Sequence, residues 1–94
     1  MLESKIQTKI KKKLEKEGWE VIKLIRTSMV GIPDLMALKD GKVKFIEVKQ
    51  TIGILSEIQK IRIKQLKEKG FEVLVWTDYE INYENKLQTL PAIL

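Results

Sequence analysis

The residues best suited to chemistry lie between positions 31 and 50, where two acids and a lysine interrupt apolar segments. Asp34 opens one apolar run, and Glu47 and Lys49 alternate with aliphatic residues in the next. Asp40-Gly41, between the two runs, predicts a two-residue hairpin turn of type I′. In that register Asp34 lies directly opposite Glu47, and Lys49 follows on the same face of the hairpin.

Two directly opposed carboxylates need a compensating positive charge. Opposed side chains have Cβ atoms roughly 4.5–5.5 Å apart, and like charges at that separation destabilise a sheet. Lys49 can neutralise one of the two acids. A divalent cation suits both acids better, and ligation by oxygen atoms alone indicates Mg²⁺ or Mn²⁺. The pattern therefore favours a metal site at Asp34 and Glu47.

Glu3 adds a third acid from the first predicted helix. The apolar residues of this helix recur at every fourth position and cover one side of it: Leu2, Ile6, Ile10 and Leu14. Glu3 projects inside that apolar arc, where a carboxylate is costly unless it is paired or bound to metal. It is thus a candidate third ligand or water-orienting group.

Each acid also has a simpler interpretation. Asp34 could be a strand-entry or Asx-turn residue, and Glu47 with Lys49 could be a solvated pair on an edge strand. Glu3 could be an acid favoured in the first turn by the helix dipole. Taken together, these interpretations require three independent segments to direct an acid to the same region by chance.

The hydrophobic pattern predicts the order helix, three strands, helix, strand. The expected ranges are 2–17, 19–26, 34–39, 43–49, 56–69 and 71–76. From residue 78 onward the pattern is ambiguous, with a further helix as one possibility. A long helical crossover separates the third and fourth strands, so these should be parallel. The expected fold is α/β, a mixed central sheet with a helix on each face.

Composition limits the classes of function. The 94 residues suffice for one domain, expected to span residues 1–94. With no cysteine and no histidine, disulfides, thiolate or imidazole metal sites and histidine-based triads are excluded. The net charge of +5 permits a polyanionic partner such as DNA or RNA. Without a membrane-length apolar run or a signal peptide, the expected location is cytoplasmic.

Asp34, preceded by Pro33 and followed on the next strand by Glu47-x-Lys49, matches the pattern of the PD-(D/E)XK nucleases. A wider set of residues resembles the virus-type replication-repair nuclease domain, VRR-NUC, over positions 3 to 76. The set comprises Glu3, Gly31-x-Pro33-Asp34-Leu35, Phe45-Ile46-Glu47-Val48-Lys49, Ser56-x-x-Gln59 and Gly70-Phe71-Glu72-Val73. The resemblance implies a PD-(D/E)XK core in the order α-β-β-β-α-β.

By this resemblance the chain is a metal-dependent phosphodiesterase acting on DNA. Asp34 and Glu47 would bind Mg²⁺ or Mn²⁺, with the Val48 carbonyl completing the ligand set. Lys49 would sit by the attacking water or the scissile phosphate. Glu3 and Gln59 match the accessory active-site positions of the family. Short free-standing members look phage-like and are similar to the Holliday junction resolvases, which work as dimers.

Gln59 has a second interpretation. Ser56-x-x-Gln59 is also a capping box, in which each side chain bonds the backbone N–H of the other residue. The two roles are compatible if only the position of the amide matters. The lysines of the first helix are most simply a solvated face. Alternatively, part of this face, or Lys60 and Lys64 on the second helix, contacts DNA phosphates.

We expect a dimeric, divalent-metal-dependent endonuclease directed at branched DNA in replication, repair or phage DNA processing. Two alternatives remain open: a nicking or restriction-like enzyme with the same core, and a non-catalytic module that binds DNA or protein. The dimer interface is expected at one of two apolar segments, residues 52–55 or 87–94.

Overall fold

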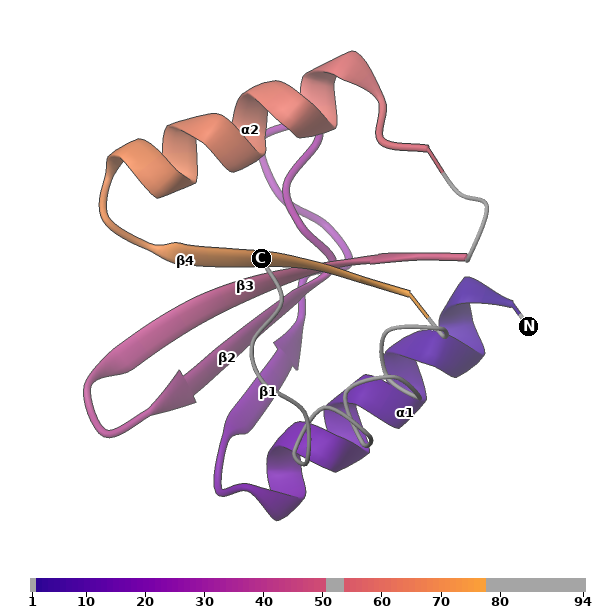
Figure 1. The fold of residues 1–94 in the computed structure, drawn as a ribbon, viewed down its shortest axis with the longest axis vertical. Helices are drawn as coiled ribbons and strands as arrows, with labels where there is room; N and C mark the ends of the chain where they lie inside the picture. The colour runs from indigo at the N-terminus through magenta and orange to yellow at the C-terminus, as the bar shows by residue number, and fades with distance from the viewer. Residues whose placement is uncertain (1, 51–53, 78–94) are drawn as a thin grey trace, which may run out of the picture.

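The computed structural model describes residues 2–50 and 54–77, which form a four-stranded sheet between two helices (Figure 1). The elements are α1 (Glu3–Lys16), β1 (Glu20–Lys23), β2 (Leu35–Lys39), β3 (Lys42–Lys49), α2 (Glu57–Glu68) and β4 (Glu72–Thr77). The strand order is β1-β2-β3-β4. Strands β1, β2 and β3 are antiparallel neighbours, and β4 runs parallel to β3. The predicted α/β class, element order and mixed sheet are confirmed.

The largest difference from the predicted ranges is at β1, which ends at Lys23 instead of residue 26. The backbone of Leu24 still donates to the Asp34 carbonyl at 2.8 Å, and the chain then leaves the sheet as a loop. Asp34 itself lies just before β2 instead of opening it. Predictions for residues 52–53 and 78–94 fall outside the described residues. Neither described helix is long and apolar enough to cross a membrane.

The hairpin between β2 and β3 has the predicted turn and register. Asp40 and Gly41 adopt φ angles of 51° and 75°, the left-handed conformation that a type I′ turn requires. Met36 pairs with Phe45, and Leu35 pairs with Ile46. Continuing this register by one residue places Asp34 opposite Glu47, as the sequence predicts.

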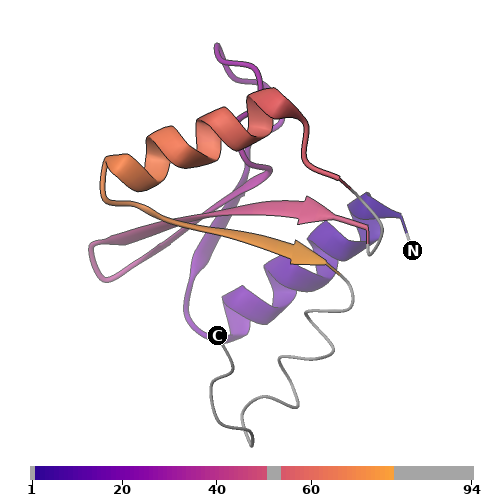
Figure 2. The ribbon, with the colours of Figure 1, turned by 45° about the horizontal axis from the view of Figure 1, so that its top comes forward.

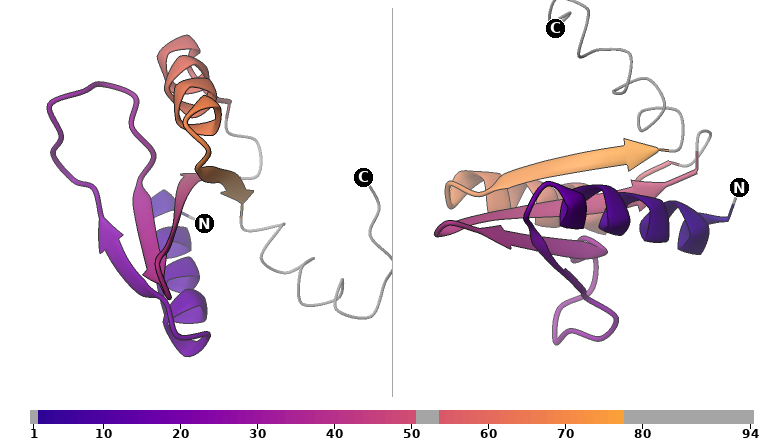
Figure 3. Two further views of the ribbon diagram at one scale, coloured as in Figure 1. Left: turned by 90° about the vertical axis from the view of Figure 1, so that its left-hand side faces the viewer. Right: turned by 90° about the horizontal axis from the view of Figure 1, so that it is seen from below.

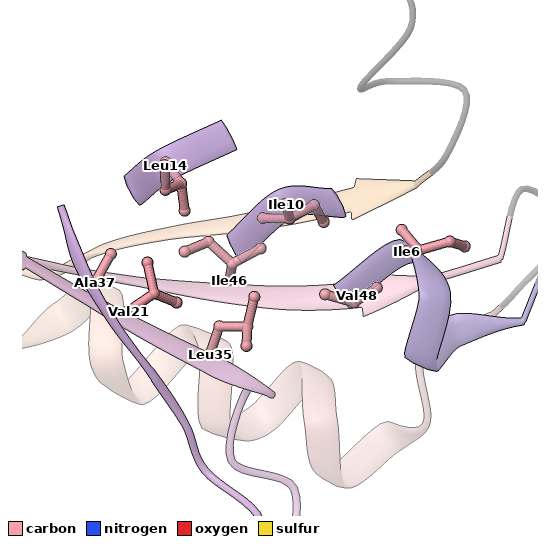
Figure 4. Close-up of a cluster of buried hydrophobic side chains, with 8 residues drawn as sticks. All are labelled: Ile6, Ile10, Leu14, Val21, Leu35, Ala37, Ile46 and Val48. Atoms are coloured by element: carbon pink, nitrogen blue, oxygen red, sulfur yellow. The ribbon is translucent and has the colours of Figure 1, made fainter. Parts of the chain in front are cut away.

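One face of the sheet packs against α1 and forms the main core. Figure 4 shows the side chains of α1 pointing toward those of the sheet. The cluster contains Ile6, Ile10, Leu14, Val21, Leu35, Ala37, Ile46 and Val48, all at most 7% exposed. Each large aliphatic side chain buried in this way contributes about 1.5–3 kcal/mol. Burial of alternate residues of β3 in this core directs Glu47 to the opposite face.

The opposite face is covered by α2. Ile63 of α2 and Val73 of β4 are buried there, and the rings of Phe45 and Phe71 meet edge to face with centroids 5.7 Å apart. The views in Figure 3 confirm that α1 and α2 lie on opposite sides of the sheet. Glu47 therefore lies under α2 and not under α1.

The loop between β1 and β2 leaves the sheet on the side of α2 (Figure 3, left). Two contacts attach it to that helix. Arg62 Nε donates to the Val30 carbonyl at 2.8 Å. Gly31, with a φ of +86°, packs so closely that an added Cβ would lie 2.9 Å from the Ile58 carbonyl oxygen.

Gly31→Ala should therefore destabilise the protein more than Gly41→Ala. Both substitutions incur the cost of about 1–2 kcal/mol for a left-handed alanine. At Gly31 the Ile58 carbonyl adds a steric cost of about 1–3 kcal/mol, whereas a Cβ at Gly41 meets nothing within 4 Å. Urea unfolding of the two variants measures the difference. Equal losses of unfolding free energy in the two variants would show that the loop accommodates the added methyl group while it stays in contact with α2.

Candidate active site

Asp34 is held by the backbone of both neighbouring strands. Its carbonyl accepts from the Leu24 N–H, and its carboxylate Oδ2 accepts from the Val48 N–H at 2.8 Å. The Asp34 side chain thereby extends the hydrogen bonding between β2 and β3 by one residue before the start of β2. This bond fixes the carboxylate beside β3, so the position at the entry to β2 and the placement of an acid opposite Glu47 are compatible in one residue.

Glu47 is the one charged residue that is buried among those the structure describes, with 2% exposure. Its Oε2 accepts from Gln59 Nε2 at 3.0 Å and lies 3.5 Å from Lys49 Nζ. Because β3 is a central strand and Glu47 is buried, the interpretation of Glu47 and Lys49 as a solvated edge pair is wrong.

The electrostatics of Glu47 reflect this burial. Burial, reinforced by the nearby negative charge of Asp34, raises the pKa of Glu47 from its ordinary value of 4.5 to about 7. Lys49 acts in the opposite direction, and its charge and hydrogen bond lower the same pKa. A side-chain hydrogen bond with Asp34 is a further, smaller cause that raises the pKa of Glu47. One lysine thus does not balance the pair, and near neutral pH the site favours a proton or another cation.

This arrangement fits a divalent cation. The donors are carboxylate oxygens, which Mg²⁺ and Mn²⁺ prefer, and their mutual repulsion is what a bound cation relieves. Within residues 2–50 and 54–77 no group of three acids is placed to hold a metal. Two carboxylates suffice for Mg²⁺, which commonly keeps several waters and binds substrate phosphates alongside one or two acids.

Glu3 and Val48 are placed differently from the acid pair. Glu3 is the first residue of α1, half-buried, and α1 covers the sheet face opposite Glu47. The described structure does not group Glu3 with Asp34 and Glu47 as metal ligands, and its role stays a prediction. Val48 contacts Asp34 through its N–H, and a role for its carbonyl also stays a prediction.

Gln59 fills both of its predicted positions at once. Its backbone N–H donates to Ser56 Oγ at 3.2 Å, and its Oε1 accepts from the Ser56 N–H at 2.9 Å, completing the capping box. Its Nε2 donates to Glu47. The orientation of the amide follows from its partners, since an N–H needs an acceptor and a carboxylate needs a donor. The cap thus aims the amide N–H at the site.

Sequence patterns do not identify Ile58 and Arg62, which attach the loop before Asp34 to α2. Gly31 is the available signal, because a glycine before Pro33 is compatible with a close backbone approach. Which residue Gly31 contacts depends on how α2 packs against the loop.

Ser56→Ala and Gln59→Glu should separate the two functions of the cap. Ser56→Ala removes one capping bond, and we expect a loss of about 1 kcal/mol in unfolding free energy. Gln59→Glu retains a residue able to complete the capping box but places a carboxylate against Glu47 in place of a donor. Thermal denaturation at pH 8 should show Gln59→Glu to be the less stable variant. The reverse order would mean that the contact with Glu47 contributes little.

Glu47→Gln should remove a pH-dependent loss of stability. With a pKa raised from 4.5 to about 7, folded Glu47 binds its proton more tightly than the unfolded chain does. This stabilisation is complete below pH 4.5 and is lost as pH rises to about 7; at about 1.36 kcal/mol per unit it amounts to about 3 kcal/mol. Denaturation in EDTA from pH 4.5 to 8 should show the stability of Glu47→Gln rising by this amount relative to wild type.

Glu57→Gln is the control for that series, because the Glu57 side chain is 87% exposed. The rise expected for Glu47→Gln should be absent from the difference between Glu57→Gln and wild type over the same pH range. If the difference in unfolding free energy between Glu47→Gln and wild type also did not change with pH, the raised pKa of Glu47 would be contradicted.

Comparison with known families agrees with the geometry. The VRR-NUC domain matches residues 2–77, which span all six elements of the fold. No curated protein matches the sequence of this chain. A domain of this family indicates a nuclease-type function with DNA as the substrate, and the fold is the corresponding α/β nuclease core. The chain belongs to the VRR-NUC domain family.

Proposed function

We propose that this protein is a divalent-metal-dependent DNA endonuclease that acts as a homodimer and prefers branched DNA such as four-way junctions. The main supporting observation is the buried Glu47 beside Asp34, with Lys49 as their nearby cation. Burying a carboxylate next to another is unfavourable for the fold alone, so a functional ligand is the better explanation.

Asp34 and Glu47 would hold Mg²⁺ or Mn²⁺, with the Val48 carbonyl as a further oxygen donor and Glu3 as an accessory group. When bound, the metal supplies electrostatic stabilisation of the charge that develops on the phosphate and activates water. The fixed carboxylate of Asp34 and the hydrogen-bonded carboxylate of Glu47 mean that the protein ligands need little rearrangement.

Lys49 is placed to act on the reacting groups. Its side chain is 14% exposed, and its ammonium is oriented toward the acid pair at 3.5 Å from Glu47. There it can position the attacking water and offset negative charge on the phosphate. Water adds to phosphorus, one P–O ester bond breaks, and the departing oxygen takes a proton. The products are a phosphate monoester end and a hydroxyl end.

Gln59 acts as a positioning residue. Its amide donates to the Glu47 oxygen that also faces Lys49, so it limits the rotation of the carboxylate. The capping box in turn limits the rotation of Gln59. The first turn of α2 therefore orients Glu47.

The preference for branched DNA and the dimer rest on the family resemblance, with two compatible features of the chain. The net charge of +5 suits a polyanionic substrate. Ile54, in the segment that follows β3, is 83% exposed, as an apolar contact between copies would require. Sedimentation as a monomer at micromolar concentration would contradict the dimer.

Cleavage of a labelled four-way junction beside linear duplex tests the proposal, with Mg²⁺, Mn²⁺ or EDTA. Wild type should cut the junction selectively with either metal and not in EDTA. Asp34→Asn should lower the rate at least about 100-fold, since it removes one charge from the site. The matched control is Asp40→Asn at the hairpin turn, which tolerates asparagine and should retain activity. Survival of every substrate with either metal would contradict the proposal.

A further inference from the structure

The loop between β1 and β2, residues 24–34, exposes an unusual set of apolar side chains. Ile25, Met29 and Val30 are 84%, 46% and 74% exposed. Single exposed apolar residues are ordinary, but three within six positions form a patch. Two basic residues are also exposed: Lys23 precedes the patch along the chain, and Arg26 lies within it, next to Ile25.

The loop is held in place and does not simply trail in solvent. Thr27 Oγ1 donates to the Met29 carbonyl at 2.7 Å, and Arg62 Nε donates to the Val30 carbonyl at 2.8 Å. Gly31 is in close contact with Ile58. These contacts do not involve the side chains of Ile25, Met29 and Val30, which stay exposed.

The same helix turn connects this loop to the acid pair. Ile58 contacts the loop, and the adjacent Gln59 bonds Glu47. Val30 precedes Asp34 by four residues, which span at most about 14 Å. DNA with a phosphate at Asp34 would therefore lie within reach of the loop that carries Val30. Figure 2 shows the loop rising beside α2, the helix whose Gln59 bonds Glu47.

We propose that Ile25, Met29 and Val30 form an apolar wedge that enters the DNA stack beside the scissile phosphate, with Lys23 and Arg26 facing the flanking phosphates. This inference rests on the proposed nuclease function and assigns its substrate selectivity. Apolar side chains inserted at a base step unstack it at a cost of a few kcal/mol. The cost is least where pairing is already disrupted, so the wedge favours a branch point over a continuous duplex.

The charges around the patch identify DNA as its occupant. A contact between two copies would bring Lys23 and Arg26 of both copies toward one surface, which like charges disfavour. A polyanion is attracted by the same residues, and basic side chains around apolar ones are typical of proteins that kink DNA.

The test compares Met29→Ser/Val30→Ser with Met29→Leu/Val30→Ile, which keeps the apolar character. Ile61→Ser is the control, because Ile61 is 48% exposed on α2, outside the loop. Each variant is assayed with Mg²⁺ on a four-way junction and on linear duplex. The Asp34→Asn forms are titrated into a junction carrying 2-aminopurine beside the branch point, whose fluorescence rises when the base is unstacked.

In the Asp34→Asn background, the protein with the wild-type loop, the conservative variant and Ile61→Ser should all raise the fluorescence. The serine variant should leave it at the level of free DNA and lower the ratio of junction to duplex cleavage by about tenfold, an effect typical of one lost stacking contact. If wild type cuts neither substrate, the nuclease proposal fails, and the fluorescence still tests the wedge. Unchanged fluorescence and selectivity in the serine variant would overturn the wedge alone. A serine variant that sediments as a smaller species than wild type would also overturn the wedge, because the patch would then be a contact between copies.

Discussion

The register of the β2–β3 hairpin is the constraint on which the rest of the structure depends. A shift of one residue would exchange the two faces of each strand. Ile46 and Val48 would then leave the core beneath α1, and Glu47 would enter it. The type I′ turn at Asp40-Gly41 and the burial of the aliphatic residues enforce the same register, so a structural requirement also places the two acids opposite each other.

The first turn of α2 unites three parts of the molecule. Ser56 begins the helix, Ile58 contacts the loop before Asp34, and Gln59 bonds Glu47. A shift of this turn would alter the cap, the loop and the carboxylate together. Positioning of a buried carboxylate through a helix end requires no additional element in a chain of 94 residues, which has room for one core. It also makes Glu47 depend on contacts far from it in the sequence.

The acid pair reduces the stability of the fold above neutral pH. A buried glutamate with a pKa raised to about 7 carries a cost above that pH, and Lys49 relieves only part of it. Such strained sites are typical of proteins that use the stored interaction energy to bind a ligand. The acids, the lysine and the family together connect the fold to nuclease chemistry on DNA.

The sequence by itself determined the order of the elements, the hairpin register and the opposition of Asp34 to Glu47, because alternation, turn residues and helix periodicity are local properties. The tertiary structure decided what depends on packing between distant segments. It packed α1 on the face opposite Glu47, buried Glu47 beneath α2, and combined the helix cap and the contact with Glu47 in the side chain of Gln59. It also attached the loop through Ile58 and Arg62, which no local pattern reveals because both contacts are made to backbone atoms of a segment about 30 positions away.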